Sequence, residues 1–157
     1  MNTVVVYDSG FGNTEQIAQA IAQALRAYGQ VRTVRVEHTH PLELQGVDLL
    51  ILGCPTQQWN ATPAMRSLID YSSSASLNRL AVACFDTRFD KPTWMTGSAA
   101  QRLVKQLREK GVTRLFPPES FFVKETQGPL ESGEVERAAR WAQMLHERVE
   151  PYHMAEH

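Results

Sequence analysis

Hydrophobic residues in this chain fall into continuous runs and alternating runs. Continuous apolar stretches at 3–7, 47–53 and 80–86 are typical of strands buried on both faces of a sheet. The segment 31–37 alternates apolar and charged residues, the pattern of a strand nearer the sheet edge. A fifth strand is predicted within 112–123, interrupted at Pro117 and Pro118.

Between these strands the apolar residues recur at helical spacing. After Asn13, the residues Ile17, Ile21 and Leu25 fall on one helix face, and Gly29 ends the run. Further helices are predicted over 61–70, 97–111 and 132–149, with Thr62, Ser98 and Ser132 at cap positions. Strands that alternate with helices predict an α/β domain whose parallel sheet is covered on both faces.

The length and composition indicate one domain. The 157 residues are 43% hydrophobic, enough to fill a single core. We predict one domain over residues 1–150 and a disordered tail over 151–157. The N-terminus lacks the features of a signal peptide, and no apolar segment approaches the length of a membrane span, so we expect a cytoplasmic protein without a membrane segment.

Charge and cysteine content exclude other classes. A formal net charge of −1 argues against a nucleic-acid binder. Cys54 and Cys84 each lie in an apolar run, which indicates buried thiols in a reducing compartment. His38 and His40 form a pair without a third ligand, so no metal site is predicted. No set of residues has the spacing of a hydrolase, so no catalytic residue is predicted.

The chemistry of such a sheet is expected at the carboxyl ends of its strands, where the strand order reverses. The loops at 9–14, 54–62 and 86–97 meet there. The first loop, SGFGNT, leads into a helix N-terminus, where free N–H groups favour a phosphate. The loop has no lysine, so it is not a Walker A motif, and Glu15 replaces the last glycine of a dinucleotide fingerprint. These features predict a neutral cradle for a dianionic monophosphate.

The segment YDSGFGNTEQIA closely resembles the phosphate-binding loop that opens flavodoxins. GCPTQQW at 53–59 and FDTR at 85–88 are similar to the second and third loops of that family, and GPLESGE precedes the last helix as it does in short single-domain members. The resemblance implies a flavodoxin-like three-layer α/β/α sandwich with five parallel strands in the order 2-1-3-4-5. It also implies a flavoprotein with one noncovalent FMN.

The resemblance assigns the three loops to the cofactor. Trp59 is the candidate for stacking on the flavin ring, and Arg88 near the ring would favour an anionic reduced flavin. Phe11 departs from the family pattern, which has a hydroxyl at this position. The cofactor-binding residues implied are Ser9, Gly10, Phe11, Gly12, Asn13, Thr14, Pro55, Thr56, Gln57, Gln58, Trp59, Asn60, Phe85, Asp86, Thr87 and Arg88.

The function implied is electron transport between a reductase and an acceptor protein, by a monomer or weak homodimer that binds neither nucleic acid nor membrane. Two alternatives stay open. One is an oxidoreductase in which the FMN receives a hydride from NAD(P)H or reduces a quinone. The other is a binding or regulatory module that has kept the fold without the flavin, to which Phe11 points.

Overall fold

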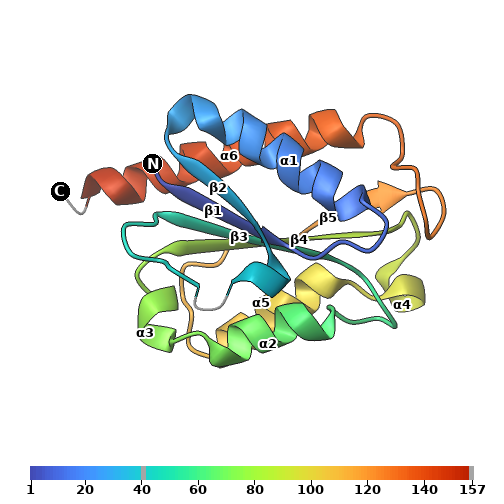
Figure 1. Cartoon of the computed structure of the whole chain (residues 1–157), viewed down its shortest axis with the longest axis horizontal. Coiled ribbons are helices and arrows are strands. Elements are labelled where there is room, and N and C mark those ends of the chain that lie inside the picture. The colour runs from blue at the N-terminus through green and yellow to red at the C-terminus, as the bar shows by residue number, and fades with distance from the viewer. Residues whose placement is uncertain (40–41, 156–157) are drawn as a thin grey trace.

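The computed structural model describes residues 1–39 and 42–155. Within these residues, five parallel strands form one sheet in the order β2-β1-β3-β4-β5 (Figure 1). This order confirms the predicted fold. The strands are β1 (Thr3–Tyr7), β2 (Val31–Arg35), β3 (Leu49–Pro55), β4 (Ala81–Phe89) and β5 (Glu119–Val123).

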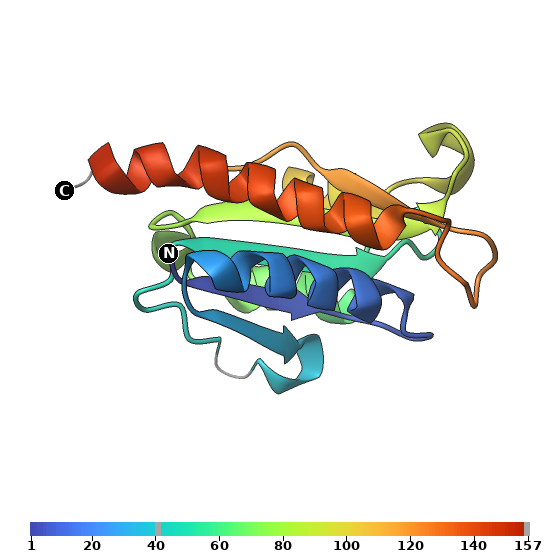
Figure 2. The same ribbon diagram turned by 90° about the horizontal axis from the view of Figure 1, so that it is seen from above.

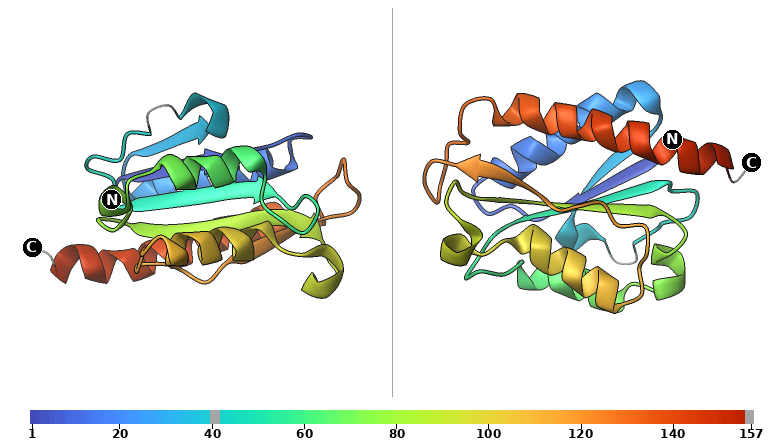
Figure 3. Two further views of the ribbon diagram at one scale, coloured as in Figure 1. Left: turned by 90° about the horizontal axis from the view of Figure 1, so that it is seen from below. Right: turned by 180° about the vertical axis from the view of Figure 1, so that it is seen from behind.

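Helices cover both faces of the sheet. Figure 2 shows α1 (Asn13–Leu25) and α6 (Glu134–Ala155) side by side over one face. The opposite face carries α2 (Pro63–Tyr71) and α5 (Ala99–Glu109) (Figure 3). Short turns complete the chain: α3 (Ser74–Leu77), α4 (Thr93–Thr96) and the 3₁₀ turns η1 (Arg26–Tyr28) and η2 (Val36–His38).

The two faces of the sheet have separate cores, because successive side chains of a strand point to opposite faces. Val4 and Val6 of β1 pack in the core beneath α2 and α5. Val5 and Tyr7 pack in the core beneath α1 and α6, which contains the mutually edge-on rings of Phe85, Phe121 and Trp141. The continuous apolar pattern of β1 follows from this double burial.

Some elements extend further than their sequence patterns predicted. β4 continues beyond residue 86 to Phe89, because Arg88 and Phe89 pair with Phe122 and Val123 of β5. The FDTR segment is therefore strand and not loop. The single-turn helices α3 and α4 were not predicted. α6 continues to Ala155, where the sequence predicted a disordered tail from residue 151; residues 156–157 lie outside the described part.

The carboxyl ends of the strands lie on the opposite side of the molecule from Met1 and the end of α6 (Figure 1). Figure 1 shows the loops after β1, β4 and β5 at one end, while Met1 and the last turn of α6 lie at the other. The loops after β1 and β4, two of those predicted to carry the chemistry, are thus far from Met1 and from the end of α6 (Figure 1).

Candidate functional site

A cleft of about 310 Å³ opens at the carboxyl ends of the strands, between the three loops identified from the sequence. A hollow of similar size, about 300 Å³, lies beside Asp48 and Arg114 at the amino ends of the strands, away from these loops. We take the first as the candidate site because it lies at the switch point of the strand order. Its lining residues are Ser9, Gly10, Phe11, Asn13, Thr14, Pro55, Thr56, Gln57, Gln58, Trp59, Thr87, Arg88, Phe89, Met95, Thr96, Val123 and Thr126.

The loop between β1 and α1 has hydrogen-bond donors without acceptors. Gly12 has φ of 91°, a left-handed conformation that turns the chain into α1. The Ser9 Oγ accepts from the backbone N–H groups of Gly12 (3.0 Å) and Glu15 (3.4 Å). Within the described chain, the backbone N–H groups of Asn13 and Thr14 meet no acceptor. Such free N–H groups at a helix N-terminus form a cradle for an anion.

Two residues of opposite charge brace this loop from outside the cleft. The Tyr7 hydroxyl donates to the Glu15 carboxylate (3.0 Å), and burial raises the pKa of Tyr7. The Arg35 guanidinium lies 3.5 Å from Glu15 and donates to the Ser9 carbonyl (3.1 Å). Arg35 therefore offsets the negative charge of Glu15 close to the anion cradle. Sequence reasoning missed Arg35, although β2 was predicted to end near it in the parallel sheet.

Hydroxyl groups join the first two loops to β4 at the floor of the cleft. The Thr14 Oγ1 lies 2.9 Å from the Thr87 Oγ1, a buried hydrogen bond between residues distant in sequence. The Thr56 N–H donates to the Thr87 carbonyl (2.9 Å), and the Thr56 Oγ1 accepts from the Ala99 N–H (3.0 Å). This network fixes the spacing of the three loops.

The second loop is a tight turn with two residues in the left-handed region. Backbone hydrogen bonds of 2.9 Å join Gln57 and Asn60 in both directions. Between them, Gln58 has φ of 50° and Trp59 has φ of 64°. This conformation costs a residue other than glycine roughly 1–2 kcal/mol, and turns of this kind usually contain Asn and Gly. The turn holds Trp59 at the cleft with 53% of its surface exposed.

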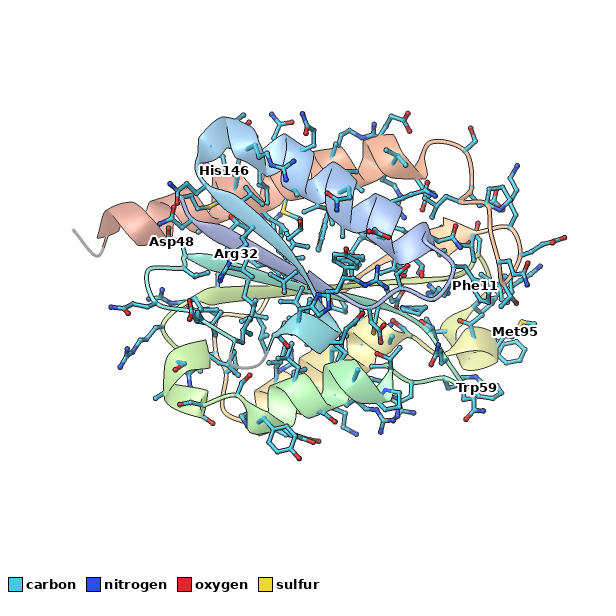
Figure 4. All side chains as sticks on the ribbon, in the orientation of Figure 1. Phe11, Arg32, Asp48, Trp59, Met95 and His146 are labelled. Atoms are coloured by element: carbon cyan, nitrogen blue, oxygen red, sulfur yellow. The ribbon has the colours of Figure 1, made fainter. Side chains whose placement is uncertain are left out.

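Large apolar side chains surround the mouth of the cleft. Of the seven large hydrophobic residues that are exposed in the described chain, five lie in three segments that follow strands: the loop before α1, the turn after β3, and residues 89–97 at the end of β4 and in α4. Figure 4 shows three of them, Phe11, Trp59 and Met95, at the same end of the molecule. We call these five residues the apolar rim: Phe11, Trp59, Phe89, Trp94 and Met95.

Most of the residues predicted to bind a cofactor line the cleft, but four do not. Phe85 is fully buried beneath Gly53. A Cβ added to Gly53 would lie 2.0 Å from the Phe85 ring. Asp86 is fully buried and accepts from Ser98 and Ala100 on the α5 side. Gly12 and Asn60 shape their turns without lining the cleft.

Other cleft residues were not named individually from the sequence. Phe89, Met95 and Thr96 lie in the predicted third loop, 86–97, whereas Val123 and Thr126 come from the end of β5 and the loop after it, which the sequence did not indicate. A cofactor site at the switch point gave no reason to include β5. Gly128 in that loop approaches the Asn13 side chain closely, since a Cβ there would lie 2.6 Å from Asn13 Oδ1.

The thiols and histidines were assigned no part in the chemistry. Cys54 and Cys84 are buried and free, and burial raises the pKa of the Cys54 thiol to about 12. Residues 1–39 and 42–155 contain no group of three His, Cys, Asp or Glu side chains placed to hold a metal ion. His38 lies in η2, and His40 lies outside the described residues. In the same part of the chain, no helix is both long and apolar enough to span a bilayer.

Comparison with known proteins points to one family. A family model described as flavodoxin matches residues 5–147. The flavodoxin of Megasphaera elsdenii is 44% identical over 52 residues, which are 32% of this chain and 38% of the relative. The flavodoxin of Clostridium saccharobutylicum is 30% identical over 89 residues, 55% of this chain and 56% of the relative. The matched segments thus span between about a third and just over half of these relatives.

Solved structures agree at the level of the fold. A flavodoxin from the domain Archaea superposes with a TM-score of 0.76 at 22% identity, covering 96% of this chain and 99% of that one. The rubredoxin oxygen:oxidoreductase of Desulfovibrio gigas also gives a TM-score of 0.76, at 18% identity. There the match covers 96% of this chain but 36% of the longer protein. The same three-layer fold therefore occurs alone and as part of a larger chain.

Proposed function

The chain belongs to the flavodoxin family, whose members bind FMN and transfer electrons, and from this premise we propose that it holds one FMN in the cleft and acts as an electron carrier. The observation that supports this most directly is the pair of free N–H groups at Asn13 and Thr14, beside a cleft with an apolar rim. When bound, FMN supplies a ring that accepts and releases electrons.

The cleft residues fit the three parts of FMN. A dianionic phosphate needs donors without a competing carboxylate, and the cradle at Asn13 and Thr14 meets this need, since Arg35 offsets Glu15. A planar apolar ring needs flat surfaces, which Trp59 and Phe11 offer. The polar chain between them would pass the hydroxyl groups at the cleft floor.

Phe11 does not remove the anion cradle. Its side chain is exposed and belongs to the apolar rim, while the free donors are the backbone N–H groups of Asn13 and Thr14. Without a hydroxyl at position 11, the phosphate is therefore bound mainly by backbone N–H groups. The reading of this chain as a flavin-free module consequently has no support in the geometry of the loop.

The redox partners are a reductase and an acceptor protein, which meet this protein at the apolar rim. The core of a protein interface is depleted in charge and enriched in aromatic residues and methionine, as the rim is. We further propose a monomer or weak homodimer in the cytoplasm, a compartment that suits the two free thiols.

The first experiment is an absorption spectrum of the purified protein before and after addition of FMN. We expect bound FMN or its uptake, with riboflavin, which lacks the phosphate, binding at least about tenfold more weakly because the cradle is left empty. The variant Gly12→Ala strains a residue with φ of 91° that has open space around it, and we expect it to weaken FMN binding more than riboflavin binding.

The outcomes separate the three functions. If neither flavin binds, both redox functions fail. If FMN and riboflavin bind equally, the cradle is not a phosphate site. If the FMN-loaded protein turns over NADPH and a quinone steadily without a reductase, the oxidoreductase replaces the carrier.

A further inference from the structure

Arg88 lies beside the cleft, yet its guanidinium is engaged by the protein itself. The side chain is 12% exposed. Its Nε donates to the Ser120 Oγ on β5 (2.9 Å), and its Nη1 donates to the Lys91 carbonyl (2.7 Å) and to the Thr96 Oγ1 (3.3 Å). One guanidinium thus joins β5 to both ends of the connection between β4 and α5. The planar fork of several donors makes arginine suited to such a junction.

The segment that Arg88 holds, residues 90–97, has few other ties. In the described chain, the other hydrogen bonds of residues 90–96 stay within 89–97, such as those from Met95 and Thr96 to the Pro92 carbonyl. Gly97, at the end of the segment, also forms a bridge with Trp59. The segment nevertheless contributes Met95 and Thr96 to the wall of the cleft. Its position therefore depends on Arg88, which binds Lys91 and Thr96, and on the bridge between Gly97 and Trp59.

The buried carboxylate of Asp86 lies close to the charged group of Arg88. The Asp86 Oδ1 lies 3.9 Å from the Arg88 Nε and accepts no hydrogen bond in the described chain. The guanidinium also lies over the Phe122 ring, 5.2 Å from its centroid. A guanidinium that faces a buried carboxylate offers little net charge to a molecule in the cleft.

We propose that Arg88 is a positioning residue: it anchors the 90–97 segment as a wall of the cleft and acts on FMN through that wall and not through its charge. The inference rests on the proposed FMN site only for its effect on binding. The anchoring itself is a property of the cofactor-free protein.

The test compares Arg88→Lys, which keeps the charge and loses the fork, with Arg88→Met, which loses both. Amide hydrogen exchange over residues 90–97 is measured in the cofactor-free protein, and FMN affinity and the reduction potential are measured after loading. We expect both variants to speed exchange in this segment by at least about tenfold and to weaken FMN binding by a similar factor. Arg140→Met, on the exposed face of α6, is the matched control and should change neither.

The opposite result has a distinct signature. If Arg88→Lys keeps wild-type exchange and affinity while Arg88→Met shifts the reduction potential, the charge acts directly on the flavin and the proposal fails. If neither variant folds, Thr96→Val, which keeps Arg88, takes their place: exchange faster than in the wild type supports anchoring, and unchanged exchange overturns it. Should wild-type protein fail to bind FMN, the exchange data would still decide the anchoring.

Discussion

Asp86 is a carboxylate without solvent contact, placed where β4 passes beneath the cleft. Its Oδ2 accepts from the Ser98 hydroxyl (2.5 Å) and the Ala100 N–H (3.0 Å), so it joins β4 to the first turn of α5. Burial raises its pKa, and the hydrogen bonds from Ser98 and Ala100 oppose that rise. Asp86 is therefore held by hydrogen bonds to its neighbours, while burial disfavours its charged form.

We expect Asp86→Asn to change how stability depends on pH. The raised pKa means that the folded protein keeps this proton to a higher pH than the unfolded chain does. The contribution of Asp86 to the free energy of unfolding is fully present below about pH 3.9, the pKa of the group in the unfolded chain. It is lost as pH rises through the folded pKa, and the loss is about 1.4 kcal/mol for each pKa unit by which folding raises the pKa. Urea unfolding from acid to neutral pH should show the wild type losing free energy of unfolding relative to Asp86→Asn. A wild type that gains relative to the variant would contradict the sign.

At the scale of elements, the features predicted from sequence are those set by local patterns. β1 and β3 are continuous apolar runs, and α1 has its stripe at Ile17 and Ile21. The end of β4 was misplaced because Arg88 and Phe89 are strand only through their pairing with β5, which is distant in sequence. The turn at Gln58 and Trp59 has neither Asn nor Gly at its centre, so nothing local marks its left-handed conformation.

The same limits apply to the candidate site. The anion cradle was predicted because a helix N-terminus follows directly from the chain order. The loop 86–97 was predicted to lie at the site, but Met95 and Thr96 were not identified as its wall, because their position depends on the side-chain contacts of Arg88. Side-chain junctions between distant segments leave no periodic pattern in a sequence.

Gly97 tests how closely the third loop packs on the second. A Cβ at Gly97 would lie 2.4 Å from the Trp59 Cα, and Gly97 has φ of 70°. We expect Gly97→Ala to lower the free energy of unfolding by at least about 2 kcal/mol, from strain and a backbone clash together. Gly111→Ala, with φ of 93° and open space around it, should lose only about 1 kcal/mol from strain. Denaturant unfolding of both variants measures the difference, and equal losses would show that the loops separate easily.

At the scale of the whole molecule, positive and negative charges nearly cancel, so little net charge is present to steer association over long range. The formal net charge is −1, and the mouth of the cleft is lined by the apolar rim. Charge steering scales with the potentials of the two partners and is screened by salt. We therefore expect the association proposed at this end of the molecule to be governed by short-range apolar contact.

We expect the rate of electron transfer from the reduced, FMN-loaded protein to a basic cytochrome c to change less than about threefold between low and moderate salt. Stopped-flow measurements over a series of ionic strengths give the slope. The double variant Gln57→Glu and Gln58→Glu adds negative charge beside the rim and should introduce a clear decrease with salt. A steep decrease in the wild type would show that local charges dominate in spite of the low net charge.

Met1 and the last turn of α6, which ends at Ala155, lie on the side away from the loops after β1, β4 and β5 (Figure 1). A tag fused to either end would attach the protein to a solid support with the cleft facing outward. On an electrode, such a layer would present every molecule in the same orientation, but the sheet would separate the cleft from the metal. We then expect weak direct electron transfer between the electrode and a flavin in the cleft, because the fold acts as an insulating spacer. Electron transfer between the flavin and dissolved mediators should be unaffected.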